Sequence, residues 1–124
     1  MAFNRNTSLP VLFNTGDSVE KSARTVSGDS GWIDIGDANE IIAQLDSDAG
    51  TGTSPTLDVK VQTSWNGTTA TAVDVPSGAF TQVVAAASMQ IKSIAIMHRY
   101  IKLAWTIAGT TPSFSFGVYI TARK

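Results

Sequence analysis

The chain has 124 residues and a mass of 13.1 kDa, the size of one domain. It contains no cysteine, which excludes disulfides, thiolate metal sites and a cysteine nucleophile. Only 15% of the residues are charged and the net charge is −1, which argues against a general nucleic-acid-binding protein. Polarity comes instead from 13 serines and 15 threonines. No apolar run reaches the ~18 residues of a membrane span or forms a signal peptide, so we expect no membrane partner and folding in the cytoplasm of the producing cell.

The few charges are distributed unevenly along the chain. All ten acidic residues lie at or before Asp74, whereas the residues from Val75 onward contain five basic residues and no acid. Two interpretations remain open. In the first, the two halves of the chain interleave in one sheet system and their charges cancel locally. In the second, an acidic end and a basic end of the folded protein orient copies or partners during docking.

Residues 1–20 show no sustained periodicity, and Pro10 and Gly16 interrupt their one apolar patch. We expect an extended N-terminal arm there, followed by a β domain over residues 21–124. The alternative is that the arm closes its own domain as an edge strand. The candidate contacts of the arm with a neighbouring subunit or a capsid are Phe3, Arg5, Leu9, Pro10, Val11, Leu12 and Phe13.

Beyond the arm, apolar and polar residues alternate with the period of two that is typical of half-buried strands. The alternation is clearest in residues 57–64, 101–108 and 113–121, and the last two segments predict a hairpin with its turn at 109–112. Residues 38–45 also fit a short helix. Less regular candidate strands are 19–26, 31–35, 40–45, 78–86 and 89–97. Seven or eight short strands predict an all-β fold, a jelly-roll-like antiparallel β-sandwich with an extended N-terminal arm.

No arrangement of residues predicts catalysis. His98 is the only histidine and has no evident partner for a triad or a metal site. Asp46 and Asp48 resemble the start of a calcium loop, but Thr51 and Leu57 stand where an EF-hand needs glycine and glutamate. We therefore predict a protein that is not an enzyme and that has no catalytic residue, cofactor or bound metal.

Trp65 is the candidate exposed aromatic residue. It stands directly before Asn66-Gly67, a pair that predicts a tight turn because both residues tolerate positive φ. An exposed aromatic ring is suited to stacking on a sugar. A carbohydrate-binding β-sandwich module is therefore an alternative function for this chain.

Six strand-and-turn motifs follow one another over about three quarters of the chain. They are GWIDIG at 31–36, GTSPTLDV at 52–59, VQTS at 61–64, GAFTQV at 78–83, RYIKLAWTI at 99–107 and GTTPSFSF at 109–116. In this order the motifs resemble small structural proteins of tailed bacteriophage virions, of the head decoration or cement type.

The resemblance implies a structural virion protein on the outer capsid surface that stabilises the shell by bridging capsid subunits. Its implied partners are the major capsid protein and further copies of itself, with a trimer favoured over a dimer. Many weak contacts would then act together. A tail or neck component of the same kind of particle is an alternative.

Overall fold

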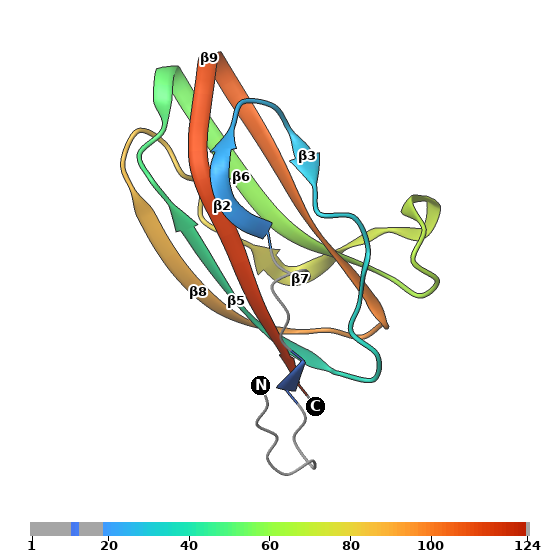
Figure 1. Ribbon diagram of the computed structural model, residues 1–124. Helices are drawn as coiled ribbons and strands as arrows, with labels where there is room; N and C mark the ends of the chain where they lie inside the picture. The colour runs from blue at the N-terminus through green and yellow to red at the C-terminus, as the bar shows by residue number, and fades with distance from the viewer. Residues whose placement is uncertain (1–10, 13–18, 124) are drawn as a thin grey trace.

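The computed structural model describes residues 11–12 and 19–123, and antiparallel strands dominate it (Figure 1). This confirms the predicted all-β fold. One 3-10 turn spans Thr69–Thr71. The strands are β1 (Val11–Leu12), β2 (Val19–Arg24), β3 (Gly28–Asp29), β4 (Ile33–Asp34), β5 (Glu40–Ser47), β6 (Thr51–Ser64), β7 (Val73–Ala79), β8 (Ser88–Ala95) and β9 (Tyr100–Arg123).

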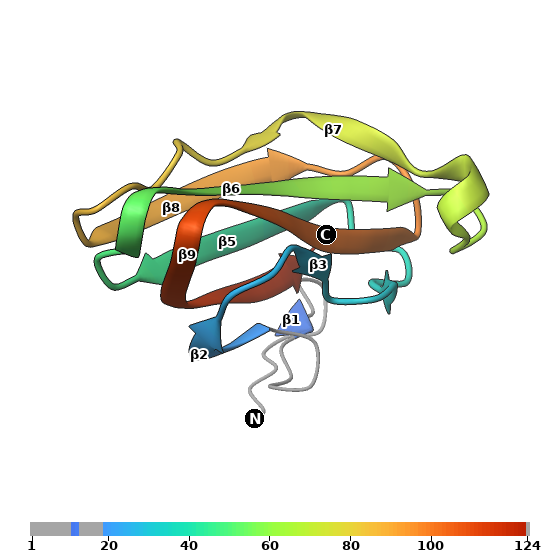
Figure 2. The same cartoon turned by 90° about the horizontal axis from the view of Figure 1, so that it is seen from above.

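The strands form two sheets that pack face to face, as the view from above shows (Figure 2). In sheet A, β5 lies between β8 and the C-terminal half of β9, and β1 and β2 pair with the other side of β9. In sheet B, β6 lies between β7 and the N-terminal half of β9, and β3 and β4 pair with the other side of β9. The arrangement is an antiparallel β-sandwich.

Strand β9 belongs to both sheets. Its first half pairs with β6 and its second half pairs with β5, and no described pairing joins the two halves to each other. The predicted hairpin between residues 101–108 and 113–121 is therefore wrong. Gly109 at φ 124° and Thr111 at φ 46° redirect the chain from one sheet to the facing sheet. Each half brings its own row of buried residues, so the halves face each other across the core.

The core consists of the inward rows that the alternation predicts. The buried residues of β6 include Leu57, Val59, Val61 and Thr63, and those of the second half of β9 include Phe114, Phe116, Val118 and Ile120. Trp105 packs against this core, with its ring edge-on to Phe116 at 5.4 Å between centroids. The helix alternative for residues 38–45 is wrong, because β5 alternates as a strand and buries Ile41, Ala43 and Leu45 completely.

Charges from the two halves of the sequence cancel locally. Arg99 pairs with Asp34, Arg123 with Glu40, and Lys102 with Asp29, so basic residues of the second half meet acidic residues of the first. The antiparallel pairing of β9 with early strands brings them together. These three pairs confirm the interleaving interpretation.

Two candidate strands agree only in part with the structure. Strand β2 begins at Val19, which is buried in the core, as the candidate strand 19–26 predicts, but it ends at Arg24. The predicted strand 78–86 is wrong beyond Ala79, because β7 ends there and only a single bridge at Val83 follows.

Val11 and Leu12 pair with the end of β9, as an edge strand of their own domain would. The other candidate arm contacts, Phe3, Arg5, Leu9, Pro10 and Phe13, lie outside the described residues.

Candidate functional site

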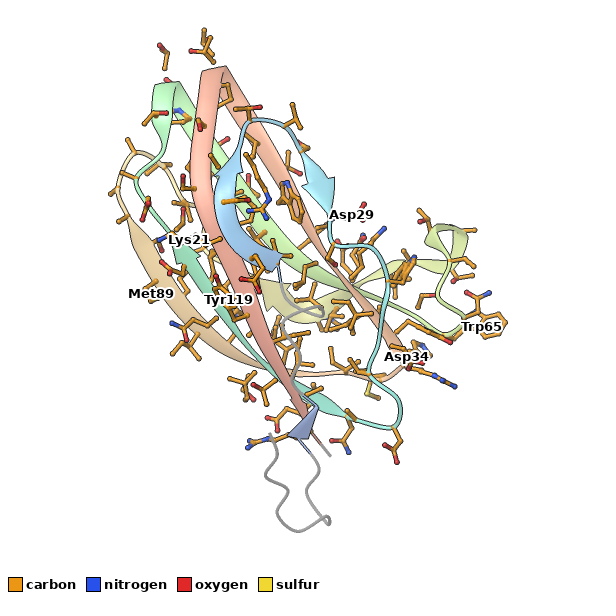
Figure 3. The ribbon with its side chains drawn as sticks, viewed as in Figure 1. Lys21, Asp29, Asp34, Trp65, Met89 and Tyr119 are labelled. Carbon is orange, nitrogen blue, oxygen red and sulfur yellow. The ribbon has the colours of Figure 1, made fainter. Side chains whose placement is uncertain are left out.

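One end of the sandwich carries the side chain that the sequence singled out as the candidate exposed aromatic. Strand β6 ends at Ser64, and the next residue, Trp65, is 66% exposed (Figure 3). We call this region, with the loop 65–72 and the neighbouring residues 34–36 and 97–100, the Trp65 end.

Internal hydrogen bonds hold the loop that carries Trp65. The Ser64 hydroxyl accepts hydrogen bonds from the backbone N–H groups of Asn66 at 3.2 Å and Gly67 at 3.0 Å. The Asn66 Oδ1 atom accepts hydrogen bonds from the Thr68 and Thr71 hydroxyls at 3.0 and 2.6 Å. The loop therefore satisfies its own polar groups and leaves the indole in solvent.

The ring of Tyr100 supports this loop from below. Tyr100 begins β9 and is the register partner of Ser64. Gly67 has φ 75°, and a Cβ atom there would lie 3.2 Å from the Tyr100 ring. Glycine is required at this position both by the backbone angle and by the close approach to the ring.

An ion pair closes the neighbouring turn. Arg99 donates from Nε and Nη2 to the two carboxylate oxygens of Asp34, at 2.8 and 2.7 Å. The hydrogen bonds from Arg99, and next that from the Gly36 N–H, lower the pKa of Asp34 to about 2. The same pairing raises the pKa of Arg99. The two groups stay ionised and neutralise each other.

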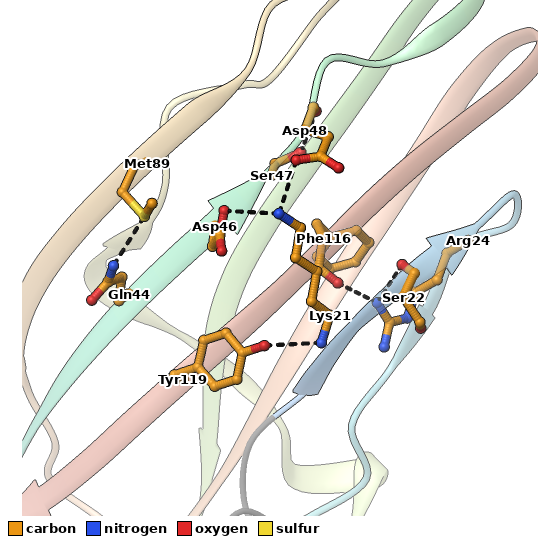
Figure 4. Close-up of polar contacts among 10 residues, drawn as sticks. All are labelled: Lys21, Ser22, Arg24, Gln44, Asp46, Ser47, Asp48, Met89, Phe116 and Tyr119. Atoms are coloured by element: carbon orange, nitrogen blue, oxygen red, sulfur yellow. Dashed lines mark hydrogen bonds and ion pairs between the residues drawn. The ribbon is translucent and has the colours of Figure 1, made fainter.

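A second exposed surface covers the solvent side of sheet A. We define the β8 face as the outward side chains of Ile42, Gln44, Met89, Ile91 and Tyr119, which share one side of β5, β8 and β9. Met89 and Ile91 are 61% and 65% exposed. The amide of Gln44 contacts the Met89 sulfur at 2.9 Å (Figure 4). The two exposed side chains of this surface are thus apolar, and Glu40 and Asp46 lie on the same side of β5, toward its two ends.

Lys21 pairs with the two aspartates that resemble the start of a calcium loop. The Lys21 Nζ atom lies 3.2 Å from Asp46 and 2.8 Å from Asp48 (Figure 4). The hydrogen bond that the Lys21 ammonium donates to Asp48, and then the one that it donates to Asp46, raise the pKa of Lys21. The backbone N–H of Lys21 also donates to the Tyr119 hydroxyl at 3.0 Å. These two aspartates are therefore already partnered by an ammonium group.

Two hollows on the described surface are small. One, of about 230 Å³, is lined by Lys60 of β6, Ala79 of β7 and Thr106 of β9, together with Phe80, which follows β7. The other, of about 250 Å³, lies beside Asp46 and Met89. Both are below the roughly 300–1,000 Å³ of typical small-molecule pockets. Exposed surfaces rather than these hollows are the candidates for recognition.

Among residues 11–12 and 19–123, no group of three potential metal ligands is present, and no helix is long and apolar enough to cross a membrane. His98 is exposed in the turn before Arg99. Sequence reasoning missed the Arg99 pair and the Tyr100 support. The one local indication of the Arg99–Asp34 ion pair was the spacing of Asp34 and Gly36, which is typical of an Asx turn.

No protein-family model matches the chain, and no curated protein matches it. Its fold is similar to that of solved carbohydrate-binding modules. A Clostridium thermocellum xylanase 10B structure, with a CBM22-1 and a GH10 module in complex with xylohexaose, gives a TM-score of 0.50 at 11% identity and 90% coverage of this chain. The match spans only 27% of that structure's chain.

Two further structures give lower scores. TmCBM61 in complex with β-1,4-galactotriose has a TM-score of 0.45 at 10% identity, over 93% of this chain and 82% of its own. A CBM4 structure has a TM-score of 0.42 at 10% identity, over 98% of this chain and 74% of its own. At 11% identity, the similarity to the xylanase 10B structure concerns the fold alone.

Proposed function

We propose that this chain is a non-catalytic carbohydrate-binding module and that Trp65 is its principal contact residue. The observation that supports this is the 66% exposed indole on a loop whose polar groups are satisfied internally. A flat aromatic ring packs well on the C–H face of a pyranose. Because the loop is already ordered, little conformational entropy is lost when a ligand binds.

The charges at the Trp65 end favour a neutral glycan. Arg99 and Asp34 neutralise each other, so an acidic sugar would have to break a bidentate ion pair to reach the guanidinium. The loop 65–72 itself contains no charged residue. The ligands named for the neighbouring structures, xylohexaose and galactotriose, belong to those proteins and serve here only as test compounds.

A glycan-binding assay with matched variants tests the proposal. Wild type, Trp65→Ala and Trp65→Phe are compared against a panel of neutral polysaccharides that includes xylan and β-1,4-galactan. We expect at least one ligand to bind wild type, Trp65→Ala to weaken binding by about tenfold or more, and Trp65→Phe to retain part of it. Val26→Ala, at a 70% exposed position, is the control that should bind like wild type. A flat panel, or equal binding by Trp65→Ala, would contradict the proposal.

A second candidate is a structural protein of a phage virion, on the capsid or in the tail or neck. Of the seven exposed large hydrophobic residues of the described chain, four are aliphatic and two are methionines, with Trp65 the only aromatic one. Aliphatic and methionine side chains are suited to protein contacts rather than to sugar stacking. Together with the motif resemblance, this observation supports contact with protein subunits.

Cosedimentation with capsids of the encoding phage distinguishes the two candidates. As a capsid-binding protein, wild type and Trp65→Ala should both pellet with the capsids. A chain lacking residues 2–16 should fold but no longer pellet, because the predicted arm contacts are gone. Absence of wild type from the pellet would contradict the virion candidate, and undiminished binding after the deletion would contradict the arm contacts.

A further inference from the structure

Strand β8 is a long, regular sheet edge with a single lysine as protection against pairing. It pairs with β5 over all eight residues without a register shift, and no other described strand pairs with it. Figure 1 shows β8 at the margin of the sandwich. The strand contains neither proline nor glycine, and Lys92 is its only charged residue. Such an edge presents a row of backbone groups to a further strand.

The other described edges all carry protective features. Strand β7 contains Pro76 and has Ser77 at φ 61°, and its pairing with β6 is interrupted by a register shift. Strand β2 has an irregularity between Val19 and Ser22. Strands β3 and β4 have two residues each. Prolines, bulges, short strands and charged side chains, lysine above all, are the devices that prevent edge-to-edge association, and Lys92 is the only one of them in β8.

We propose that β8 pairs with β8 of a second copy of this chain, antiparallel, around a two-fold axis at Ile91. A two-fold axis makes two copies of one strand antiparallel, so the same edge serves on both sides. Ile91 then faces Ile91 of the partner subunit, and Met89 lies opposite the partner's Ser93. The outward contacts bury two side chains that are 61% and 65% exposed in the single chain.

The charges of the edge are compatible with this register. Lys92 lies opposite the partner's Gln90, and the two lysines are offset along the strands by two residues, about 7 Å. The outward residues of β8 are Met89, Ile91, Ser93 and Ala95, all uncharged. No like charges therefore stand directly opposite each other, which is the arrangement that would oppose pairing.

The dimer is independent of the proposed function, since it concerns contact between copies. It would give each assembly two Trp65 ends, and two linked sites raise the apparent affinity for a repetitive ligand. It also differs from the trimer that the phage resemblance implies, so the mass of the particle in solution separates the two expectations.

Sedimentation velocity on the full chain over a range of concentrations tests the pairing. Wild type should reach twice the 13.1 kDa mass of one chain. Ile91→Lys, at an exposed position, should keep the circular dichroism of wild type and weaken dimerisation by at least about tenfold, through charge repulsion at the axis. Val73→Lys, at a 54% exposed position on the protected β7 edge, is the matched control and should dimerise like wild type.

Amide hydrogen exchange supplies a second readout. Amides of β8 that do not bond to β5 should gain protection as the concentration rises, and this gain should vanish in Ile91→Lys. A monomer at all concentrations, a trimer, or a dimer that Ile91→Lys leaves intact would overturn the proposal. A wild-type monomer that captures an extended segment of another protein would overturn it as well.

Discussion

Trp65 combines high exposure with an ordered backbone. Singly exposed hydrophobic side chains are common on protein surfaces, so the ordered loop beneath the ring, rather than exposure alone, distinguishes Trp65. Ser64 and Asn66 organise the turn beneath it, and Tyr100 supports Gly67. The contacts that order this loop are made by the neighbours of Trp65. Substitutions of these neighbours therefore test the order of the loop without changing the indole.

Gly67→Ala should destabilise the protein more than Gly36→Ala. Both positions have positive φ, 75° and 63°, so both replacements cost backbone strain of about 1 kcal/mol or more. Only Gly67 adds a contact, with Tyr100 ring atoms 3.2 Å from the new Cβ, whereas nothing lies within 4 Å of a Cβ at Gly36. Urea unfolding of the two variants measures the difference. Equal losses would show that the ring does not support the loop.

Asp34 should make stability depend on pH in acid. Its pKa of about 2 in the folded protein is below the ordinary value of 3.8, because Arg99 and the Gly36 N–H bind the carboxylate. The stabilisation is therefore complete above the ordinary pKa and is lost as pH falls from about 3.8 through about 2. Carboxyl NMR should give the low pKa directly, and Asp34→Asn should flatten this part of the stability profile. A pKa near 3.8 would mean that the ion pair does not form in solution.

At the scale of the elements, the sequence predicted which residues face the core better than it predicted their partners. Alternation located the buried rows of β6 and of both halves of β9, because burial on one face is a local property. It could not show that the halves of β9 lie in different sheets. That result depends on backbone angles at Gly109 and Thr111, and the composition of the turn fits a hairpin equally well.

Gly109→Ala should therefore weaken the passage of β9 between the sheets. The new Cβ would lie 2.9 Å from the Ser54 carbonyl oxygen and 3.0 Å from the Pro55 Cα, both backbone atoms, at φ 124°. We expect a loss of about 2 kcal/mol or more in the free energy of unfolding. Thr111→Gly, which relieves φ 46°, should be neutral or stabilising by up to about 1 kcal/mol. A harmless Gly109→Ala, or a strongly destabilising Thr111→Gly, would contradict this account of the bend.

At the scale of the whole molecule, sequence-distant segments form one sandwich. Long antiparallel ladders join the end of the chain to β5 and β6, and the uneven charges of the sequence meet in cross-strand pairs. The candidate site was only partly accessible to sequence reasoning. Trp65 stood out by its place before a turn, but its support by Tyr100 and the neighbouring Arg99 pair arise from strand pairing between distant residues.

Salt should have little effect on the stability of the chain. The pairs Lys60–Asp74, Arg99–Asp34 and Arg123–Glu40 are formed by side chains that are 30–61% exposed. Exposed pairs contribute about 0–1 kcal/mol each and are screened by salt, whereas the apolar core is not. Urea unfolding at low salt and at about 0.5 M sodium chloride should therefore agree within roughly 1–2 kcal/mol. A larger loss in high salt would mean that ion pairs, rather than the core, dominate stability.

NMR of the three tryptophan indole N–H groups is the most direct test of the proposed binding of a glycan at Trp65. Replacing Trp65 by Phe assigns its signal. The Trp105 N–H donates to the Val26 carbonyl at 3.2 Å, and the Trp32 N–H is buried, so both serve as internal controls. On titration with the neutral oligosaccharide selected by the panel, the Trp65 signal should shift and saturate while the other two stay unchanged. An unchanged Trp65 signal at saturating ligand, or shifts confined to Trp32 or Trp105, would contradict the claim.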